Sequence, residues 1–120
     1  MNKTTLVMGA STNPSRYSNM AIKKLRNAQV DVKAFGLKKG KVIDVSIDTE
    51  PIDYDSIDTV TLYLGAKNQP EYYNYIIGLQ PRRVIFNPGT ENPDFYKILK
   101  ANDIESEVAC TLVLLGTNQY

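Results

Sequence analysis

The stretch LVMGASTNPSRYSNMAIKKL, residues 6–25, joins an apolar run to a helical pattern through a turn of small and polar residues. The run TTLVMGA at 4–10 is short and is stopped by Gly9, which is typical of a buried parallel strand. Beyond the turn, Ile22 and Leu25 keep the spacing of a buried helix face. A strand, a turn and a helix in this order predict the first half of a βαβ unit, from which parallel sheets are built.

Strand and helix patterns continue to alternate along the chain. Further strands are expected at 29–37, 57–65, 82–87 and 108–110, and further helices at 68–79 and 93–102. The polar segment 38–56 is expected to form an extended connection with one short strand at 42–45, and the apolar tail after residue 110 fits a strand or a helix. This alternation predicts one domain over residues 1–120 with an α/β, three-layer Rossmann-like fold, in which a mostly parallel sheet of about five strands carries helices on both faces.

Composition excludes several kinds of function. The 14 Lys and Arg residues nearly balance the 13 Asp and Glu residues, so no net field favours nucleic acid or an anionic membrane surface. The chain contains no histidine, which excludes histidine-based triads, histidine metal ligands and histidine general bases. The most common hydrolase active sites are therefore excluded, and we expect no metal site.

The sequence also favours a particular compartment. No apolar run approaches the roughly 20 residues that cross a bilayer, and the polar start MNKTT is unlike a secretory signal. A cytoplasmic protein is therefore expected. Cys110 is the single cysteine, so no disulfide can form within the chain, which fits a reducing compartment.

The turns that follow the predicted strands are the candidate site. In an open parallel sheet, ligands bind outside the carboxyl ends of the strands, near the point where the connections change direction. The turns concerned are 9–17, 36–41, 65–68, 87–92 and 110–111.

The first of these turns is suited to bind a phosphate. Gly9 and Ala10 allow close approach of the backbone, and the helix that follows presents unpaired amide groups with partial positive charge. Arg16 adds a forked cation. Hydroxyl and amide donors come from Ser11, Thr12, Asn13, Ser15 and Ser18. The alternative is an ordinary capped helix start, because Ser and Asn are favoured there without any ligand.

The turn does not match the dinucleotide fingerprint, which needs glycine at three set positions. This chain has Gly9, Ser11 and Pro14 in that region, and its second strand ends AFGLKKGK, without the acidic residue that binds the ribose of NAD. A phosphorylated ribose is favoured instead by three lysines, Lys38, Lys39 and Lys41. Both NADP and coenzyme A carry such a ribose, and a solvated basic turn is the alternative.

Five segments of the chain together resemble a known family. They are GASTNPSRYSNMAIKKL, VDVKAFG, IDTVTLYL, RRVIFNPGTENPD and EVAC, and they are similar to the small CoA-binding proteins, relatives of the N-terminal CoA-binding domain of the succinyl-CoA synthetase alpha subunit. The resemblance covers nearly the whole chain. Its most specific parts are the G-A-S-x-N-P turn at Gly9 to Pro14 and the ordered series of strand-end turns. It implies a Rossmann-like fold that binds coenzyme A or an acyl-CoA.

The resemblance assigns a role to each turn. The pyrophosphate would lie on the first turn and the helix start, at Gly9, Ala10, Ser11, Asn13, Pro14, Arg16, Tyr17 and Ser18. The adenine and the phosphorylated ribose would lie beside Phe35, Gly36, Leu37, Lys38 and Lys39. The pantetheine arm would be lined by Leu64, Gly65, Ala66, Asn87, Pro88 and Gly89. Cys110 matches a cysteine that relatives often have at the end of a late strand.

The chain also departs from the family pattern. Relatives commonly have a P-x-N-P sequence after the second strand, where the adenine would bind, and this chain has AFGLKK. Catalysis in succinyl-CoA synthetase depends on a phosphorylated histidine from another domain, and this chain contains no histidine. The resemblance therefore implies a non-catalytic carrier, sensor or regulatory module with a small-molecule nucleotide ligand. Its protein partner and the formation of a homo-oligomer stay open.

Two other functions stay open as alternatives. An NADP-binding, reductase-like subunit is favoured by the lysines after the second strand. A ligand-free interaction domain that keeps only the fold is favoured by the altered AFGLKK turn, since fold alone does not secure function.

Three further groups of residues have two readings each. Cys110 is interpreted as a packed core thiol, with a mixed disulfide to coenzyme A as the alternative. Three tyrosines are expected to cover the interface of a helix with the sheet, or a subunit contact, rather than to stack on adenine: Tyr72, Tyr73 and Tyr75. Three acids are expected in a solvated turn rather than at a metal or an acid/base site: Asp53, Asp55 and Asp58.

Overall fold

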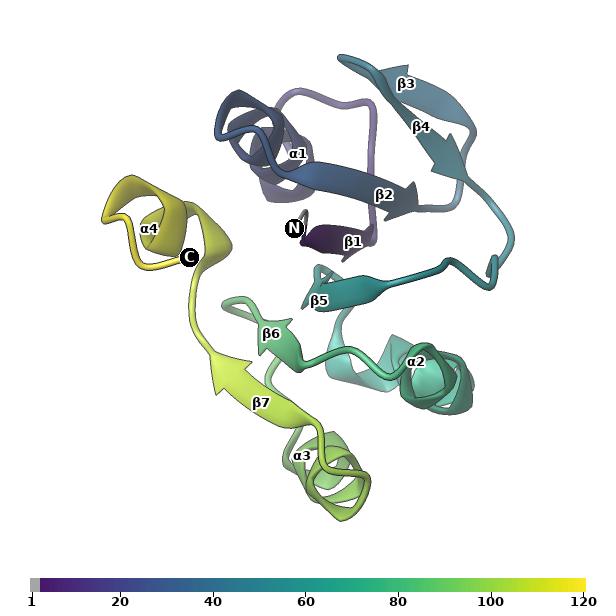
Figure 1. The fold of residues 1–120 in the computed structure, drawn as a ribbon. Coiled ribbons are helices and arrows are strands. Elements are labelled where there is room, and N and C mark those ends of the chain that lie inside the picture. The colour runs from purple at the N-terminus through teal and green to yellow at the C-terminus, as the bar shows by residue number, and fades with distance from the viewer. Residues whose placement is uncertain (1–2) are drawn as a thin grey trace.

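The computed structural model describes residues 3–120, and one sheet runs through the centre of this part of the chain (Figure 1). Its seven strands are β1 Thr4–Met8, β2 Asp31–Phe35, β3 Gly40–Val42, β4 Val45–Asp48, β5 Ile57–Leu62, β6 Arg83–Phe86 and β7 Glu105–Val108. Their order is β3-β4-β2-β1-β5-β6-β7, and every neighbouring pair is parallel except β3 with β4. The predicted α/β fold with a mostly parallel sheet is confirmed, with seven strands instead of about five.

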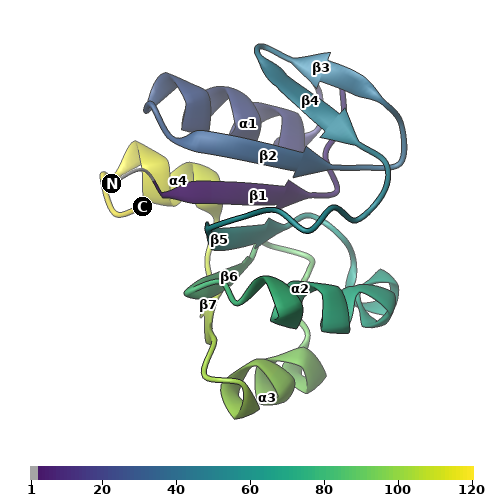
Figure 2. The same ribbon diagram turned by 45° about the vertical axis from the view of Figure 1, so that its right-hand side comes forward.

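Helices cover both faces of the sheet, as predicted (Figures 1 and 2). One face carries α1 Tyr17–Asn27 and α4 Thr111–Gly116, and the other carries α2 Tyr73–Leu79 and α3 Pro93–Ala101. Two short 3-10 turns, η1 Ala66–Asn68 and η2 Pro70–Tyr72, precede α2. The apolar tail thus forms a helix, and β7 ends at Val108, where the predicted strand 108–110 was expected to begin.

The sequence explains where α1 and α3 lie. Ile22 and Leu25 of α1 are fully buried against the sheet, as their spacing predicts. At the start of α3, the Asn92 side chain accepts a hydrogen bond from the Phe95 amide at 3.2 Å, and Pro93 occupies the first turn. Both are common helix-start features, because the first amides of a helix lack partners within it.

The edge of the sheet is an antiparallel hairpin of β3 and β4, where the sequence predicted one short strand at 42–45. That prediction is wrong: Val42 pairs with Val45, and Ile43 and Asp44 form the turn between them. Ile43 adopts a positive φ of 56° and exposes its side chain, while the Asp44 carboxylate accepts hydrogen bonds from the Arg26 guanidinium at 2.9 and 2.8 Å. The turn is therefore fixed by α1, which the local pattern does not reveal.

The core divides into two clusters, one on each face of the sheet. The cluster under α2 and α3 includes the fully buried side chains of Ile76, Phe95, Leu99 and Phe86. The cluster under α1 consists of Val7, Ala10, Ile22, Leu25, Ala34, Val42, Val45 and Ile47. The hairpin therefore extends the apolar surface that α1 covers beyond β2.

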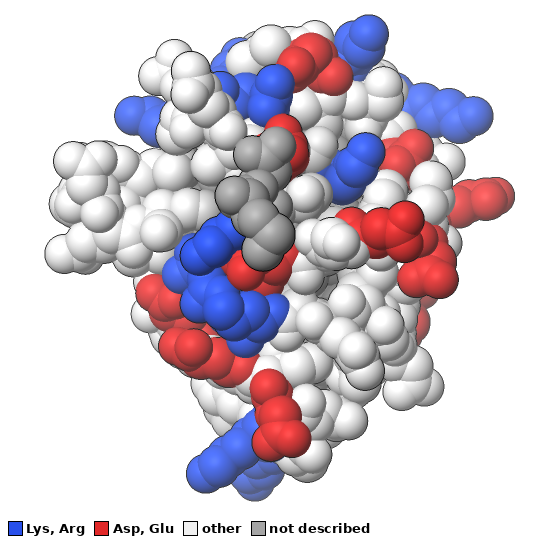
Figure 3. Space-filling model, in the orientation of Figure 1, with Lys and Arg blue, Asp and Glu red and all other residues white. Residues whose placement is uncertain are grey.

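Positive and negative side chains are interspersed over the face shown in Figure 3. The lobe at the left of that view belongs to α4, whose sequence TLVLLG carries no charge. No helix within residues 3–120 is long and apolar enough to cross a membrane.

Phe95 should be a main determinant of stability. Its ring is fully buried, stacks on Tyr73 with centroids 4.2 Å apart, and meets Phe86 edge-to-face. We expect Phe95→Ala to lower the free energy of unfolding by about 3–5 kcal/mol, because the cavity cannot close fully. Urea unfolding measures this, with Val113→Ala on the exposed side of α4 as the control. A loss below that of the control would contradict the assigned core.

Candidate functional site

The turns predicted to form the site gather at the carboxyl ends of the strands, which form the carboxyl edge of the sheet. The chain passes from β1 to β2 on one side, and later builds β5, β6 and β7 on the other side of β1. The connections therefore change direction at β1, which is where open α/β sheets bind ligands. In Figure 2 the turns after β1, β2 and β5 lie at the arrowhead end of the sheet.

The turn after β1 has a backbone conformation that strongly favours glycine. Gly9 has a φ of +95°, and a Cβ atom there would stand 3.0 Å from the carbonyl carbon and oxygen of Tyr63. The amides of Gly9 and Ala10 both donate to the Phe35 carbonyl, each at 2.9 Å. This turn is therefore held between the ends of β2 and β5, and these two amides are not available to a ligand.

The turn after β2 packs directly against the turn after β1. A Cβ atom on Gly36 would lie 2.3 Å from the Ala10 carbonyl oxygen, and one on Gly40 would lie 2.3 Å from Cγ2 of Thr12. Neither glycine tolerates a side chain without movement of its neighbour. The two turns form one continuous surface.

Hydrogen bonds within the first turn fix its shape. The Asn13 amide donates to the Ser11 hydroxyl at 3.1 Å, and the Ser15 amide donates to the Asn13 side-chain oxygen at 3.0 Å. The buried Asn19 side chain of α1 donates to the Ser11 carbonyl at 2.9 Å. The Arg16 amide donates to the Asn13 carbonyl at 3.0 Å.

Four backbone amides around this turn have no protein acceptor among residues 3–120. They are those of Ser11, Thr12, Tyr17 and Ser18. No side chain caps the start of α1, and no acidic residue lies in its first turn. The positive end of the helix is therefore not neutralised, and these amides can receive an anion.

Several predicted site residues have side chains that face the interior. Ser18, Phe35 and Asn87 are at most 4% exposed, so their side chains offer almost no surface to a ligand. Asn87 uses its amide internally: Nδ2 donates to the Thr61 hydroxyl and the Leu62 carbonyl, and Oδ1 accepts from the Thr111 amide. The side chains of Asn13, Arg16, Tyr17, Leu37, Lys38 and Lys39 are exposed.

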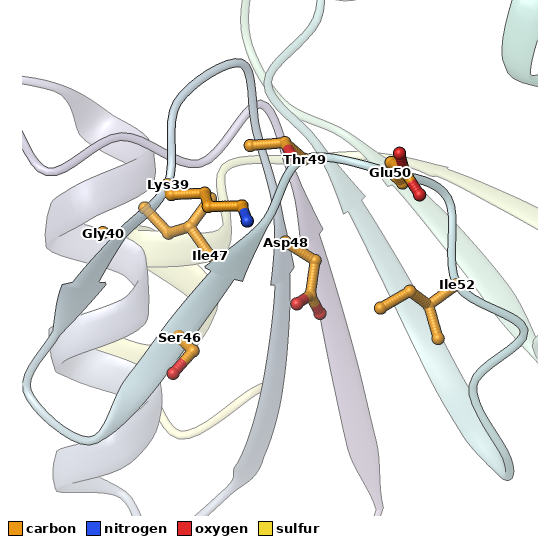
Figure 4. Close-up of a pocket in the computed structure, with 8 residues that line it drawn as sticks. All are labelled: Lys39, Gly40, Ser46, Ile47, Asp48, Thr49, Glu50 and Ile52. Atoms are coloured by element: carbon orange, nitrogen blue, oxygen red, sulfur yellow. The ribbon is translucent and has the colours of Figure 1, made fainter.

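An open pocket of about 510 Å³ lies beside the turn after β2, at the end of β4 (Figure 4). It is lined by Lys39, Gly40, Ser46, Ile47, Asp48, Thr49, Glu50 and Ile52. Figure 4 shows Lys39 extending from its turn toward the end of β4. Of these residues the sequence singled out only Lys39, because the segment that forms β4 was expected to be an extended connection.

Two tyrosines hold the segment that borders this pocket. The Tyr54 hydroxyl donates to the Asp48 carboxylate, and the Tyr75 hydroxyl of α2 donates to the Ile52 carbonyl at 2.5 Å. Burial raises the pKa of Tyr75 to about 12 and that of Tyr54 also above its ordinary value. Tyrosine hydroxyls are protonated at neutral pH even at their ordinary pKa of about 10, so both act as donors to the segment that borders the pocket.

The turns after β5 and β6 make the other half of the edge. Gly65 and Gly89 both face open space, with no atom near the position of an added Cβ. Cys110 lies at the cap position of α4 and is half-buried. Nearby, burial raises the pKa of the Tyr63 phenol to about 12.

The remaining candidate residues have structural roles. Tyr73 stacks on Phe95, and Tyr72 meets Phe35 edge-to-face, which confirms that these tyrosines cover the interface of the helix with the sheet. Asp58 pairs with Arg82 at 3.1 Å, which lowers the pKa of the carboxyl. Within residues 3–120, no three His, Cys, Asp or Glu side chains are grouped to hold a metal ion.

Comparison with known families gives one match that spans most of the chain. The sequence model of a family described as a CoA binding domain matches residues 3–116. A search of curated proteins found no match.

Solved structures share the fold over its full length. A crystal structure of an uncharacterized protein is 42% identical, with a TM-score of 0.96 and coverage of 100% of this chain and 99% of that one. Cell-free ID.343 from Thermus thermophilus is 20% identical, with a TM-score of 0.86 and coverage of 99% and 91%. A hypothetical protein from Pyrococcus horikoshii OT3 is 23% identical, with a TM-score of 0.87 and coverage of 98% and 84%. At these identities, the last two show the fold alone.

The geometry at Gly9 makes a prediction about stability. We expect Gly9→Ala to destabilise the fold by on the order of 1–3 kcal/mol, because alanine is strained at this φ and its Cβ would press on the Tyr63 carbonyl. The control is Gly78→Ala, at an exposed helical position with open space around it, where a gain of roughly 0.5–1 kcal/mol is expected. Thermal unfolding of both variants measures the difference. Equal effects would show that the turn is not constrained.

Proposed function

The chain belongs to the CoA-binding domain family, and on that premise we propose that it binds coenzyme A or an acyl-CoA along the carboxyl edge of its sheet. In this proposal the protein is a non-catalytic carrier, sensor or regulatory module of the cytoplasm.

The observation that carries the proposal is the group of unpartnered amides after β1. The amides of Ser11, Thr12, Tyr17 and Ser18 surround the start of α1, whose positive dipole end no acidic side chain offsets. Backbone amides at a helix start suit a phosphate group. The exposed Arg16 side chain stands beside them and adds a positive charge. We assign the pyrophosphate of the ligand to this position.

The pocket beside Lys39 fits the adenosine part of the ligand. The Lys39 ammonium can pair with a phosphate on the ribose, and Lys38 lies next to it on the exposed turn. The carboxylates of Asp48 and Glu50 can accept hydrogen bonds from the adenine amino group or a ribose hydroxyl. These contacts replace those of the P-x-N-P turn that the chain lacks.

The open side of the turns after β5 and β6 suits the pantetheine arm. Gly65 and Gly89 leave space there, and the partly buried Leu64 offers an apolar contact. The half-buried Cys110 thiol lies after β7, next along the same edge. The non-catalytic role rests on the residue types present, since no histidine is available as an acid, a base or a phosphate acceptor.

Titration with coenzyme A tests the proposal. We expect a measurable Kd by isothermal titration calorimetry and a rise in Tm with ligand concentration, since a ligand that binds only the folded state stabilises it. No heat and no Tm shift at millimolar coenzyme A, acetyl-CoA and longer acyl-CoAs would overturn the proposal and favour a ligand-free interaction domain. Saturable NADPH binding that coenzyme A cannot displace would favour the reductase-like alternative.

Lys39→Ala tests the assignment of the ribose phosphate. We expect roughly tenfold weaker binding of coenzyme A, because one charge-assisted contact is lost. Binding of dephospho-CoA, which lacks that phosphate, should stay within about twofold of the wild-type value. Lys97→Ala, at an exposed position of α3, is the matched control. Equal weakening of both ligands would show that Lys39 does not contact the ribose phosphate.

A further inference from the structure

A fully buried glutamine, Gln69, connects the turn after β5 to the turn after β6. These two turns form the far half of the carboxyl edge, and the turns after β1 and β2 form its near half. Gln69 follows η1 and has no exposed surface. Its side-chain nitrogen donates to the Leu64 carbonyl at 2.9 Å and to the Thr90 carbonyl at 2.8 Å. Leu64 belongs to the turn after β5, and Thr90 belongs to the turn after β6. One side chain therefore joins two segments that are far apart in the sequence.

Asn92 completes this connection from the other side. Its side-chain nitrogen donates to the Gln69 side-chain oxygen at 2.9 Å and to the Tyr73 hydroxyl at 2.8 Å. Its oxygen accepts from the Phe95 amide at the start of α3. Both Gln69 N–H groups and its oxygen are thus engaged. The amide has only one satisfactory orientation, because rotation would place its oxygen against two carbonyl oxygens.

The connection sets the distance between the two segments. Leu64, Gly65 and Ala66 lie on one side of it, and Asn87, Pro88 and Gly89 lie on the other. The Thr90 hydroxyl and amide both bind the Asn87 carbonyl, at 2.8 and 2.9 Å, so the second segment is held to the Gln69 amide. A buried, fully paired amide network of this kind is rigid.

The near half of the edge is held by other contacts. Gly9 and Ala10 bind the Phe35 carbonyl, and Gly36 packs on Ala10. None of these contacts involves Gln69 or Asn92. A change in the Gln69 side chain therefore removes none of the hydrogen bonds that hold the turn after β1.

We infer that Gln69 is a positioning residue that sets the opening between the turns after β5 and β6, and thereby selects a ligand with a pantetheine arm over a bare adenosine phosphate. The inference rests on the proposed function. Gln69 does not contact the ligand; it acts through the Leu64 and Thr90 carbonyls, which it holds at a fixed separation.

Gln69→Glu tests this role. At a pH of about 7.5 the introduced carboxylate would face two carbonyl oxygens, which repel it. We expect affinity for coenzyme A to fall at least roughly tenfold, and affinity for adenosine 3′,5′-bisphosphate to change by less than about twofold, each relative to wild type at the same pH. The matched control is Gln29→Glu, an exposed glutamine past the end of α1, which should change neither affinity.

Acid should partly restore the variant. Burial raises the pKa of the introduced carboxyl above its ordinary value of about 4.3. Its protonated form, favoured as pH falls, can donate to one carbonyl and accept from Asn92. At a pH of about 5.5 the affinity for coenzyme A, relative to wild type, should therefore recover toward its normal value. A purely structural defect would weaken both ligands together, without this recovery.

Asn92→Asp is the second variant, because it keeps the oxygen that caps α3 and replaces the amide nitrogen that donates to Gln69 and to the Tyr73 hydroxyl. It should show the same selective loss. If neither variant folds, nuclear magnetic resonance of the wild type decides: the Gln69 side-chain amide signals should shift with coenzyme A and not with adenosine 3′,5′-bisphosphate.

Two results would overturn the positioning role while leaving the proposed function intact. One is equal loss of both ligands at both pH values, and the other is unchanged binding of coenzyme A by folded Gln69→Glu. If wild-type protein binds neither ligand, the proposed function itself has failed, and the positioning role fails with it.

Discussion

Two amides on one carbonyl oxygen hold the turn on which the proposed site depends. Gly9 and Ala10 both donate to the Phe35 carbonyl, and the Tyr63 carbonyl lies against Gly9 from the other side. This arrangement ties the end of β1 to the ends of its two neighbours, β2 and β5. The chain then leaves the sheet through a glycine with positive φ, and four of the amides that follow, those of Ser11, Thr12, Tyr17 and Ser18, have no acceptor among residues 3–120. The proposed anion site is thus a consequence of how three strands end.

The carboxyl edge of the sheet has a near half and a far half, which are held by different interactions and offer different groups to a ligand. The near half is held by close backbone packing at Gly9 and Gly36, and it offers amides and lysines to phosphate groups. The far half is held by the buried amides of Gln69, Asn87 and Asn92, and it offers open space beside small residues. A long ligand with a charged end and a less polar arm fits this division, because each part meets groups of its own polarity.

Much of the fold follows from the sequence, because the spacing of apolar residues and the turn residues determine each strand and helix locally. The apolar run before Gly9, the helical spacing of Ile22 and Leu25, and the alternation of strands and helices together predict the α/β sheet and the edge where the turns gather. The hairpin of β3 and β4 was missed because Val42 and Val45 are three positions apart, which breaks strand alternation, and because its turn depends on Arg26 far away in the sequence. The pocket at the end of β4 was missed with it. The sequence does not predict the burial of Gln69 either, because a polar residue in a polar segment is buried only by tertiary contacts.

Amide nuclear magnetic resonance of labelled protein during titration with coenzyme A tests ligand binding at this edge most directly. The predicted result is a saturable shift of the amides of Ser11, Thr12, Tyr17 and Ser18, as each gains a phosphate acceptor, while amides at the opposite edge, such as those of Asp31 and Arg83, stay unchanged. Saturating binding with shifts confined to that opposite edge, or no shift at millimolar ligand, would contradict a coenzyme A site on the turn after β1.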